Sequence, residues 1–427
     1  MTIDPAALAA VRAWIVRVGL TSDDPAHLLS GASERLLAAG IPIVRTHLSF
    51  ATLDPRKRAE NIVWLRGRGT TRELHDHDEF ERSFPRSPFP QMLKTGRLQR
   101  RWRLERPGDA EGFPVIEAMQ RSGATDLVAS VVPFTSTAEI FEGAAISAAT
   151  DRPSGFTEAE LAMLDELTPT MGLAAYRIAM SDALASVLRA YLGIDAGHHV
   201  LSGHVRPGEG NSVTAAILLA DLRGFTRATE REGPGIINRL GEHLAAIAEP
   251  VEAAGGEVLK FIGDGLLAAF PVKGDAPTAC CDAALAAARE ALTSNARVNA
   301  AHAASTRLDL DVALHLGEVF YGNIGAASRL EFTVIGPAVN EASRIESLCD
   351  QLERDLLMSK SFAGACSAPA ASLGCFELRG VSANREVFGL VDQASGATPS
   401  VRNGAARCRS RRAETDDNER NLACPTQ

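Results

Sequence analysis

Two aspartates in the second half of the chain stand beside apolar segments. Residues 217–226 read ILLADLRGFT, so an apolar segment ends on Asp221. Residues 259–270 read LKFIGDGLLAAF, and two apolar segments meet there at Asp264, in a Gly-Asp-Gly turn that is typical of a hairpin tip. If these strands pair in one sheet, the aspartates lie side by side, and a divalent cation is the usual means of keeping both ionised. Two ions there would suit phosphoryl transfer.

A third segment carries groups that bind phosphate. Residues 331–346 read EFTVIGPAVNEASRIE, which predicts a strand, a Gly-Pro turn and a helix. Asn340 and Arg344 are four residues apart and therefore share one helix face. The arginine can hold phosphate oxygens in a bidentate manner, and the asparagine can donate to a ribose or phosphate oxygen. An aspartate at a strand end or in a turn is usually structural on its own, but the three segments together favour a catalytic interpretation.

These segments resemble a known family. Residues ~199–391 are similar to the catalytic domain of class III adenylate and guanylate cyclases. The matching motifs are ADLRGFT, LKFIGDG, HLGEVFYGNIG at 315–325 and FTVIGPAVNEASRIE, in the family's order. The resemblance implies that Asp221, the backbone carbonyl of Leu222 and Asp264 bind two Mg²⁺ or Mn²⁺ ions per site. It also implies that Asn340 and Arg344 position the ribose and stabilise the pentavalent transition state.

The resemblance also indicates how the purine is read. Lys260 matches the lysine that reads the adenine edge, and Thr333 stands where many members carry a second purine-reading aspartate. Guanylate cyclases usually place glutamate and cysteine or serine at these positions, so the pair favours ATP. Threonine also resembles a subgroup with bicarbonate-responsive members, which predicts bicarbonate activation. Arg379 is the nearest candidate for the family's phosphate-binding lysine, with plain surface exposure as the alternative.

The family's sites form between two head-to-tail catalytic domains, so we expect a homodimer with two equivalent sites. The implied reaction is attack of the ribose 3′-oxygen of ATP on the α-phosphorus, which releases pyrophosphate and cyclic AMP. The alternatives are a guanylate cyclase and a catalytically silent nucleotide-binding regulatory module. The chain has no GxxxxGK[ST] segment and no GG[DE]EF hairpin, which excludes a P-loop NTPase and argues against a diguanylate cyclase.

The elements that position these residues predict an α+β protein. From residue 213 the order is strand, long helix, hairpin, long helix and strand, as in a ferredoxin-like, palm-like βαββαβ unit within a catalytic domain at 199–391. Residues 1–155 combine helices with strands at 41–53, 61–65 and 126–134, and resemble GAF-type sensor domains. This regulatory domain would receive an unknown small-molecule or protein input.

Residues 156–198 predict a connecting helix and linker. Thr157 and Glu160 form a capping box at the start of a helix that extends towards residue 192, and Pro169 should kink or split it. The helix either closes the first domain or pairs with a second copy and carries a signal to the catalytic domain. Residues 193–212 are expected to be a linker or hinge, and residues 392–427 a disordered tail.

Composition limits the remaining function classes. The chain has 427 residues, 45% of them hydrophobic, and a net charge of −9, which argues against nucleic-acid binding. No apolar run approaches the ~20 residues of a membrane span, and no signal peptide is evident. The seven cysteines lack a CxxC pair, which predicts reduced thiols and a cytoplasmic protein. The cluster His75–Asp78 could hold a metal ion but reads better as a polar loop.

Overall fold

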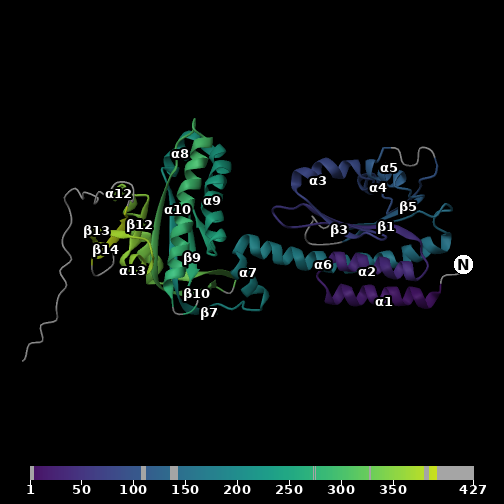
Figure 1. Cartoon of the computed structure of the whole chain (residues 1–427), viewed down its shortest axis with the longest axis horizontal. Helices are drawn as coiled ribbons and strands as arrows, with labels where there is room; N and C mark the ends of the chain where they lie inside the picture. The colour runs from purple at the N-terminus through teal and green to yellow at the C-terminus, as the bar shows by residue number, and fades with distance from the viewer. Residues whose placement is uncertain are drawn as a thin grey trace, which may run out of the picture. The chain divides into compact units, whose positions relative to one another are not determined.

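The chain forms two compact units, residues 1–201 and 202–427, in a computed structural model. The structure describes residues 4–106, 112–134, 143–272, 274, 276–326, 328–378 and 384–391. Each unit combines helices with one sheet, so the predicted α+β class is confirmed (Figure 1). The tail at 392–427, predicted to be disordered, and Arg379 lie outside the described residues.

The first unit is built on a six-stranded antiparallel sheet in the order β3-β2-β1-β6-β5-β4. Three strands lie where the sequence predicts them, and the others are polar or alanine-rich segments without a clear strand pattern. The strands are β1 (Ile43–Ala51), β2 (Ala59–Leu65), β3 (Gly69–His75), β4 (Gln99–Arg103), β5 (Asp126–Pro133) and β6 (Gly143–Thr150).

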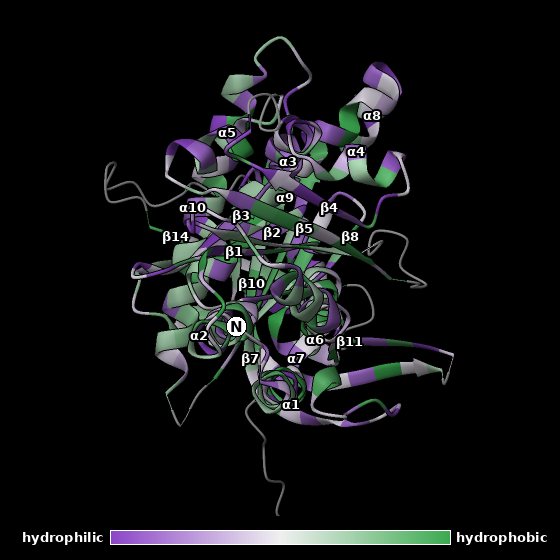
Figure 2. Ribbon diagram, turned by 90° about the vertical axis from the view of Figure 1, so that its right-hand side faces the viewer, coloured by the Kyte–Doolittle hydropathy of each residue, from purple (hydrophilic) through white to green (hydrophobic). Residues whose placement is uncertain are grey.

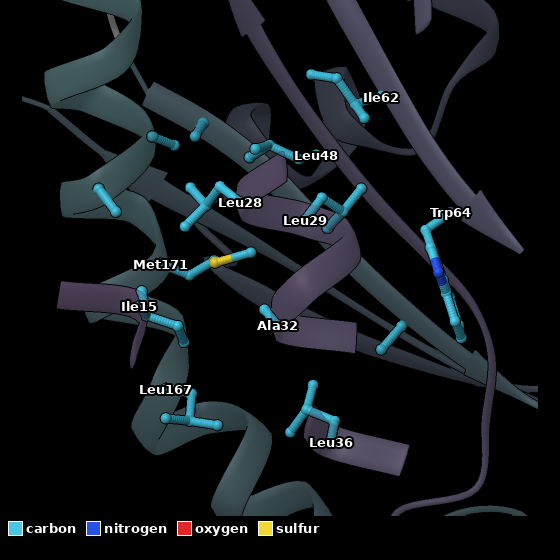
Figure 3. Close-up of a cluster of buried hydrophobic side chains, with 14 of the residues drawn as sticks. Ile15, Leu28, Leu29, Ala32, Leu36, Leu48, Ile62, Trp64, Leu167 and Met171 are labelled. Atoms are coloured by element: carbon cyan, nitrogen blue, oxygen red, sulfur yellow. The ribbon is translucent and has the colours of Figure 1, made fainter. Parts of the chain in front are cut away.

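One face of this sheet is covered by three helices, α1 (Pro5–Thr21), α2 (Pro25–Ala38) and α6 (Glu158–Leu192). Asp4 and Asp24 cap α1 and α2, each followed by a proline at the first helical position. Figure 3 shows the core between helices and sheet, where Ile15, Leu28 and Met171 meet Leu48 and Trp64. This core fixes the sheet against α6.

The other face carries shorter elements, α3 (His77–Ser83), η1 (Phe84–Arg86), α4 (Phe89–Lys94) and α5 (Pro114–Arg121). A smaller cluster that includes Trp102, Ile116 and Leu127 lies on this side. Asp76 has a structural role, because its side chain accepts a hydrogen bond from the Glu79 amide at 2.7 Å and caps α3. The predicted polar loop at 75–78 is therefore wrong: His75 ends β3, Asp76 is the cap, and His77 and Asp78 begin α3.

Helix α6 is a single 35-residue element with the predicted capping box of Thr157 and Glu160. The helix continues through Pro169, so of the predicted kink or split the split does not occur. Among the described residues, α6 is the one helix with the length and composition to cross a membrane, yet 44% of that stretch is buried inside the protein. Short helix α7 (Ile194–Leu201) follows, so part of the predicted linker at 193–212 is helical.

The second unit contains a sheet in the order β13-β14-β12-β10-β7-β9-β8, with β11 paired to β10. Its central strands run β10-β7-β9-β8, which is the arrangement of the predicted βαββαβ unit with α9 and α10 as the crossover helices. The strands are β7 (Gly210–Arg223), β8 (Glu257–Ile262), β9 (Gly265–Pro271), β10 (Asp309–Ala326), β11 (Arg329–Ile335), β12 (Leu356–Ser359), β13 (Ala370–Phe376) and β14 (Arg385–Leu390).

Helices cover both faces of the central strands. Alternate residues of β7 face opposite sides, so Ala216 and Leu218 join the core that contains residues of α9 and α10, whereas Ala215 and Ile217 join the one that contains residues of α11. Strand β11 mixes hydrophobic and hydrophilic residues along its length (Figure 2). The helices are α8 (Phe225–Glu232), α9 (Ile236–Ala253), α10 (Pro277–Ala301), α11 (Pro337–Glu346), α12 (Cys349–Leu352) and α13 (Lys360–Ala365), with η2 at Gly233–Gly235.

Candidate active site

The structure brings Asp221 and Asp264 together at one end of β7. Strands β7 and β9 pair with Ala220 opposite Leu266, which places the start of β9 beside Asp221. A Cβ atom on Gly265 would lie 2.7 Å from Asp221 Oδ1, so only glycine fits between the two carboxylate-bearing segments. Asp264 immediately precedes this glycine in the turn between β8 and β9.

Both carboxyl groups of the Asp221 and Asp264 pair have raised pKa values. Burial raises the pKa of Asp221 to about 6, and the negative charges of Asp264 and Asp311 act in the same direction. Burial also raises the pKa of Asp264 above its ordinary value. Ionising both groups is therefore unfavourable in the protein alone, and a bound cation would reverse this.

Two further acidic residues lie close to the pair and were missed by the sequence reasoning. Asp311 stands opposite Asp221 across the pairing of β10 with β7. Glu346, the last residue of α11, has its pKa raised to about 7 by burial, next by the charge of Asp221, and then by that of Asp311. Glu346 ends the 331–346 segment that also carries Asn340 and Arg344. This acidic residue was therefore visible in the motif, but no function was predicted for it.

The aspartate pair suits a hard divalent cation that binds together with a nucleotide. The side chain of Leu222 has no donor atom and is buried in the core, so only its backbone carbonyl is a candidate ligand. Across the described ranges, no group of three or more His, Cys, Asp or Glu side chains is placed to hold a metal ion. Mg²⁺ commonly takes one or two protein carboxylates and completes its shell with water and substrate phosphates, and these residues fit that pattern.

Lys260 and Thr333 lie on neighbouring strands, Lys260 on β8 three residues before the turn that holds Asp264 and Thr333 on β11. Lys260 Nζ donates to Glu331 Oε1 at 2.9 Å, which links β8 to β11. Thr333 is two residues further along β11 and shares the strand face of Glu331. Its hydroxyl is buried and, among the described residues, has no hydrogen-bond partner. The structure thus places both predicted purine-reading residues in one region.

Asn340 and Arg344 lie on the side of α11 that faces away from the sheet. Ala338, Ala342 and Ile345 are the buried residues of this helix and pack inward. Asn340 is exposed and Arg344 is half-buried, and in the described part of the chain the Arg344 guanidinium forms no ion pair. An arginine without a carboxylate partner is available to an anionic ligand.

The predicted site residues therefore form separate groups within one chain. Glu346 brings the end of α11 to the aspartates, whereas Asn340 and Arg344 are on the outward side of the same helix. Arg379 falls at 379–383, outside the described residues, so its predicted contact with phosphate has no structural description.

Comparison with known proteins identifies this arrangement. Residues 209–365 match the family described as the adenylate and guanylate cyclase catalytic domain. This segment matches the catalytic domain of class III cyclases. The cyclase domain contains every predicted site residue except Arg379. The family generally uses divalent metal ions.

The curated relatives match over the same region. An adenylate cyclase of Anabaena cylindrica is 32% identical over 190 residues, which are 44% of this chain and 36% of that protein. Adenylate cyclase 2 of Rhizobium meliloti is 29% identical over 235 residues, 53% of this chain and 63% of that protein. The chain thus spans less than two thirds of either relative. The crystal structure of the guanylyl cyclase Cya2 aligns with a TM-score of 0.38 at 25% identity, over 44% of this chain and 97% of that one.

Proposed function

We propose that this protein is an adenylate cyclase that converts ATP to 3′,5′-cyclic AMP and pyrophosphate. The observation that carries the proposal is the meeting of Asp221 and Asp264 beside Gly265 within a cyclase catalytic domain. Burial opposes the ionisation of both carboxylates, and the charge of Asp264 also opposes that of Asp221, so a divalent cation would stabilise this site.

The residues of the chain account for the remaining steps. Divalent cations, when bound, supply activation of the ribose 3′-hydroxyl and neutralisation of the departing pyrophosphate. Asp221 and Asp264 hold that charge in place. Arg344 binds the α-phosphate oxygens as the bond from the ribose 3′-oxygen to phosphorus forms and the bond to the pyrophosphate oxygen breaks. Asn340 orients the ribose, and the 3′-hydroxyl proton is released to solvent.

The preference for ATP rests on Lys260 and Thr333. A lysine ammonium only donates hydrogen bonds, and adenine N1 is an acceptor, whereas guanine N1 carries a hydrogen. The Thr333 hydroxyl can either donate or accept, so it tolerates the adenine amino group. Two curated relatives named adenylate cyclases support the same choice.

The separation of the site residues favours a head-to-tail homodimer. One chain would supply Asp221 and Asp264. The second chain would supply the remaining site residues, which are Lys260, Thr333, Asn340 and Arg344. Large apolar side chains are exposed next to these groups, namely Phe261 (55%), Ile262 (48%) and Ile335 (48%). Apolar surface that clusters beside a functional site commonly marks a protein interface.

The first unit is proposed to regulate the second, as a GAF-type sensor. Besides its buried side, α6 exposes Leu173, Leu184 and Tyr191, with exposed fractions of 68%, 55% and 81%. Residues eleven and seven positions apart return to nearly the same helix face. Such an apolar stripe suits parallel pairing of two α6 helices, by which the sensor could align the catalytic domains.

The proposal is tested with the purified full chain, ATP and Mn²⁺, and separation of the nucleotide products. Asp264→Asn should abolish cyclic AMP formation, because the amide cannot hold the cation charge. Glu249→Gln, an equivalent change on the exposed surface of α9, should leave the rate unchanged. Undiminished synthesis by Asp264→Asn, with wild-type ATP turnover, would exclude the assigned role.

A further inference from the structure

The first unit contains a cavity of about 420 Å³ between its sheet and the short helices α3 to α5. Residues of β1, β2, β3, β5 and β6 form its floor, and Phe80, Phe84, Phe89 and Ile116 belong to its other wall. This volume is in the range of small-molecule sites, which are about 300–1,000 Å³. The cyclase domain contributes no residue to it.

Charged groups are concentrated on the floor of this cavity. Alternate residues of β1, Arg45, His47 and Ser49, line it, while Thr46 and Leu48 are buried on the opposite side of the strand. Arg58, beside β2, adds a second guanidinium. The cavity therefore has a positively charged floor, with Glu73 as an acidic neighbour.

Several of these polar groups have no partner among the described residues. Arg58 Nη1 is buried without a hydrogen bond, and so are both ring nitrogens of His75, although carboxylate oxygens of Glu73 and Glu79 lie 3.9 and 3.5 Å from that ring. The side chain of Arg45 forms no ion pair in the described part of the chain. Burial lowers the pKa of Arg45 to about 10, against the opposing charge of Glu73. Buried, unpaired donors destabilise a fold unless a ligand satisfies them.

The remaining wall is aromatic and favours a flat ligand. The rings of Phe80 and Phe84 stack with centroids 4.7 Å apart, and the ring of Phe89 stacks on His47 at 6.0 Å. The Arg58 guanidinium lies 5.1 Å from the centre of the Phe80 ring, so charge and aromatic surface meet in one place. A planar apolar body with one anionic group would contact both.

We infer that this cavity binds a small organic anion, a carboxylate or phosphate carried on a flat apolar body, with Arg45 and Arg58 as the anion-binding residues. The sheet would supply the charged contacts, and the aromatic residues of α3, η1 and α4 would enclose the apolar part. The site is independent of the proposed cyclase chemistry, because none of its residues belongs to the catalytic domain.

The test is calorimetric titration of the full chain with 2-naphthoate, 2-naphthyl phosphate and the neutral 2-naphthamide, each up to about 1 mM. At least one anion should bind about tenfold more tightly than the amide, because the amide lacks the charge that the arginines require. The better anion distinguishes carboxylate from phosphate recognition. Arg45→Gln and Arg58→Gln should remove this preference, whereas Arg68→Gln, in the exposed turn between β2 and β3, should retain it. Equal binding of anion and amide, or no binding of either anion, would overturn the inference.

A second measurement needs no ligand. Arg45→Met removes an unpaired buried charge, so the variant should unfold at a temperature a few degrees above wild type. A residue that serves ligand binding rather than folding commonly shows this behaviour. A variant that unfolds at a lower temperature would indicate that Arg45 stabilises the fold through Glu73, and would contradict its assignment to a ligand.

Discussion

Asp221 and Asp311 face each other across β7 and β10, yet only one of them is neutralised by the chain. Arg223 Nε donates to Asp311 Oδ2 at 3.0 Å, and the guanidinium makes a second contact to the same carboxylate. No arginine or lysine in the described part of the chain makes an ion pair with Asp221. Asp311 is therefore paired with an arginine, whereas Asp221 has no cationic partner in the described part of the chain and lies close to Asp264.

This asymmetry predicts a metal-dependent stability. The pKa of Asp221 is raised from 3.8 to about 6, so the stability it contributes is present below pH 3.8 and is lost as pH rises through about 6. Mn²⁺ binds the ionised form, so its effect on the unfolding temperature should grow between about pH 5 and about pH 7.5. Thermal scans with and without Mn²⁺ measure this difference.

The matched variant separates the metal from general salt effects. Asp221→Asn should unfold at a higher temperature than wild type without metal, because it removes charge repulsion, and should lose most of the Mn²⁺ shift. Glu249→Gln should behave as wild type in both conditions. A full Mn²⁺ shift in Asp221→Asn would place the metal elsewhere.

Arg344 is predicted to act on the transition state. Arg344→Ala should lower kcat on the order of 10³-fold with a much smaller change in KM, since the developing phosphoryl charge loses its stabilising cation. Initial rates over a range of ATP concentrations distinguish the two parameters. Arg289→Ala, at an exposed position of α10, is the control. A change confined to KM would mean that Arg344 only helps to bind ATP.

The two-chain site can be tested by mixing two inactive variants. Asp264 and Arg344 belong to the two sets of site residues that different chains would supply. A dimer of one Asp264→Asn chain and one Arg344→Ala chain would therefore retain one intact site. After co-expression in equal amounts, activity should recover to about a quarter of wild type if chains pair at random. Two variants of the same group, Asp221→Asn and Asp264→Asn, should not complement each other. Failure of the first pair to recover activity in verified mixed dimers would contradict the shared site.

Much of the catalytic domain could be predicted because its sequence patterns are local. The apolar segment before Asp221 and the Gly-Asp-Gly turn at Asp264 define strands and a hairpin, and the strand order then brings them together. Asp311 was missed because its importance comes from strand register, which links positions distant in sequence. The cavity of the first unit was missed for the same reason. Arg45 and His47 read as ordinary alternating polar residues until the helices that cover them are known.

Buried His243 in the second unit should make the stability of the protein depend on pH. His243 is buried, its Nδ1 lies 2.6 Å from Asn295 Oδ1, and burial lowers its pKa below the ordinary 6.5. The stability this neutral histidine gives is present above pH 6.5 and is lost as pH falls below that value. His243→Gln keeps a donor for Asn295 but does not titrate. Its unfolding temperature should therefore fall less than that of wild type on acidification, and an equal fall would exclude His243 as a contributor.

Adenylate cyclase activity is best tested by product formation from the purified full chain given equal concentrations of ATP and GTP with Mn²⁺. An adenylate cyclase should give cyclic AMP as the main product, with one pyrophosphate released for each cyclic nucleotide, and Asp264→Asn should lose both. Predominant cyclic GMP would contradict the roles given to Lys260 and Thr333. No cyclic nucleotide from either substrate, by the full chain or by residues 202–427, would contradict the proposal that the protein is an active cyclase.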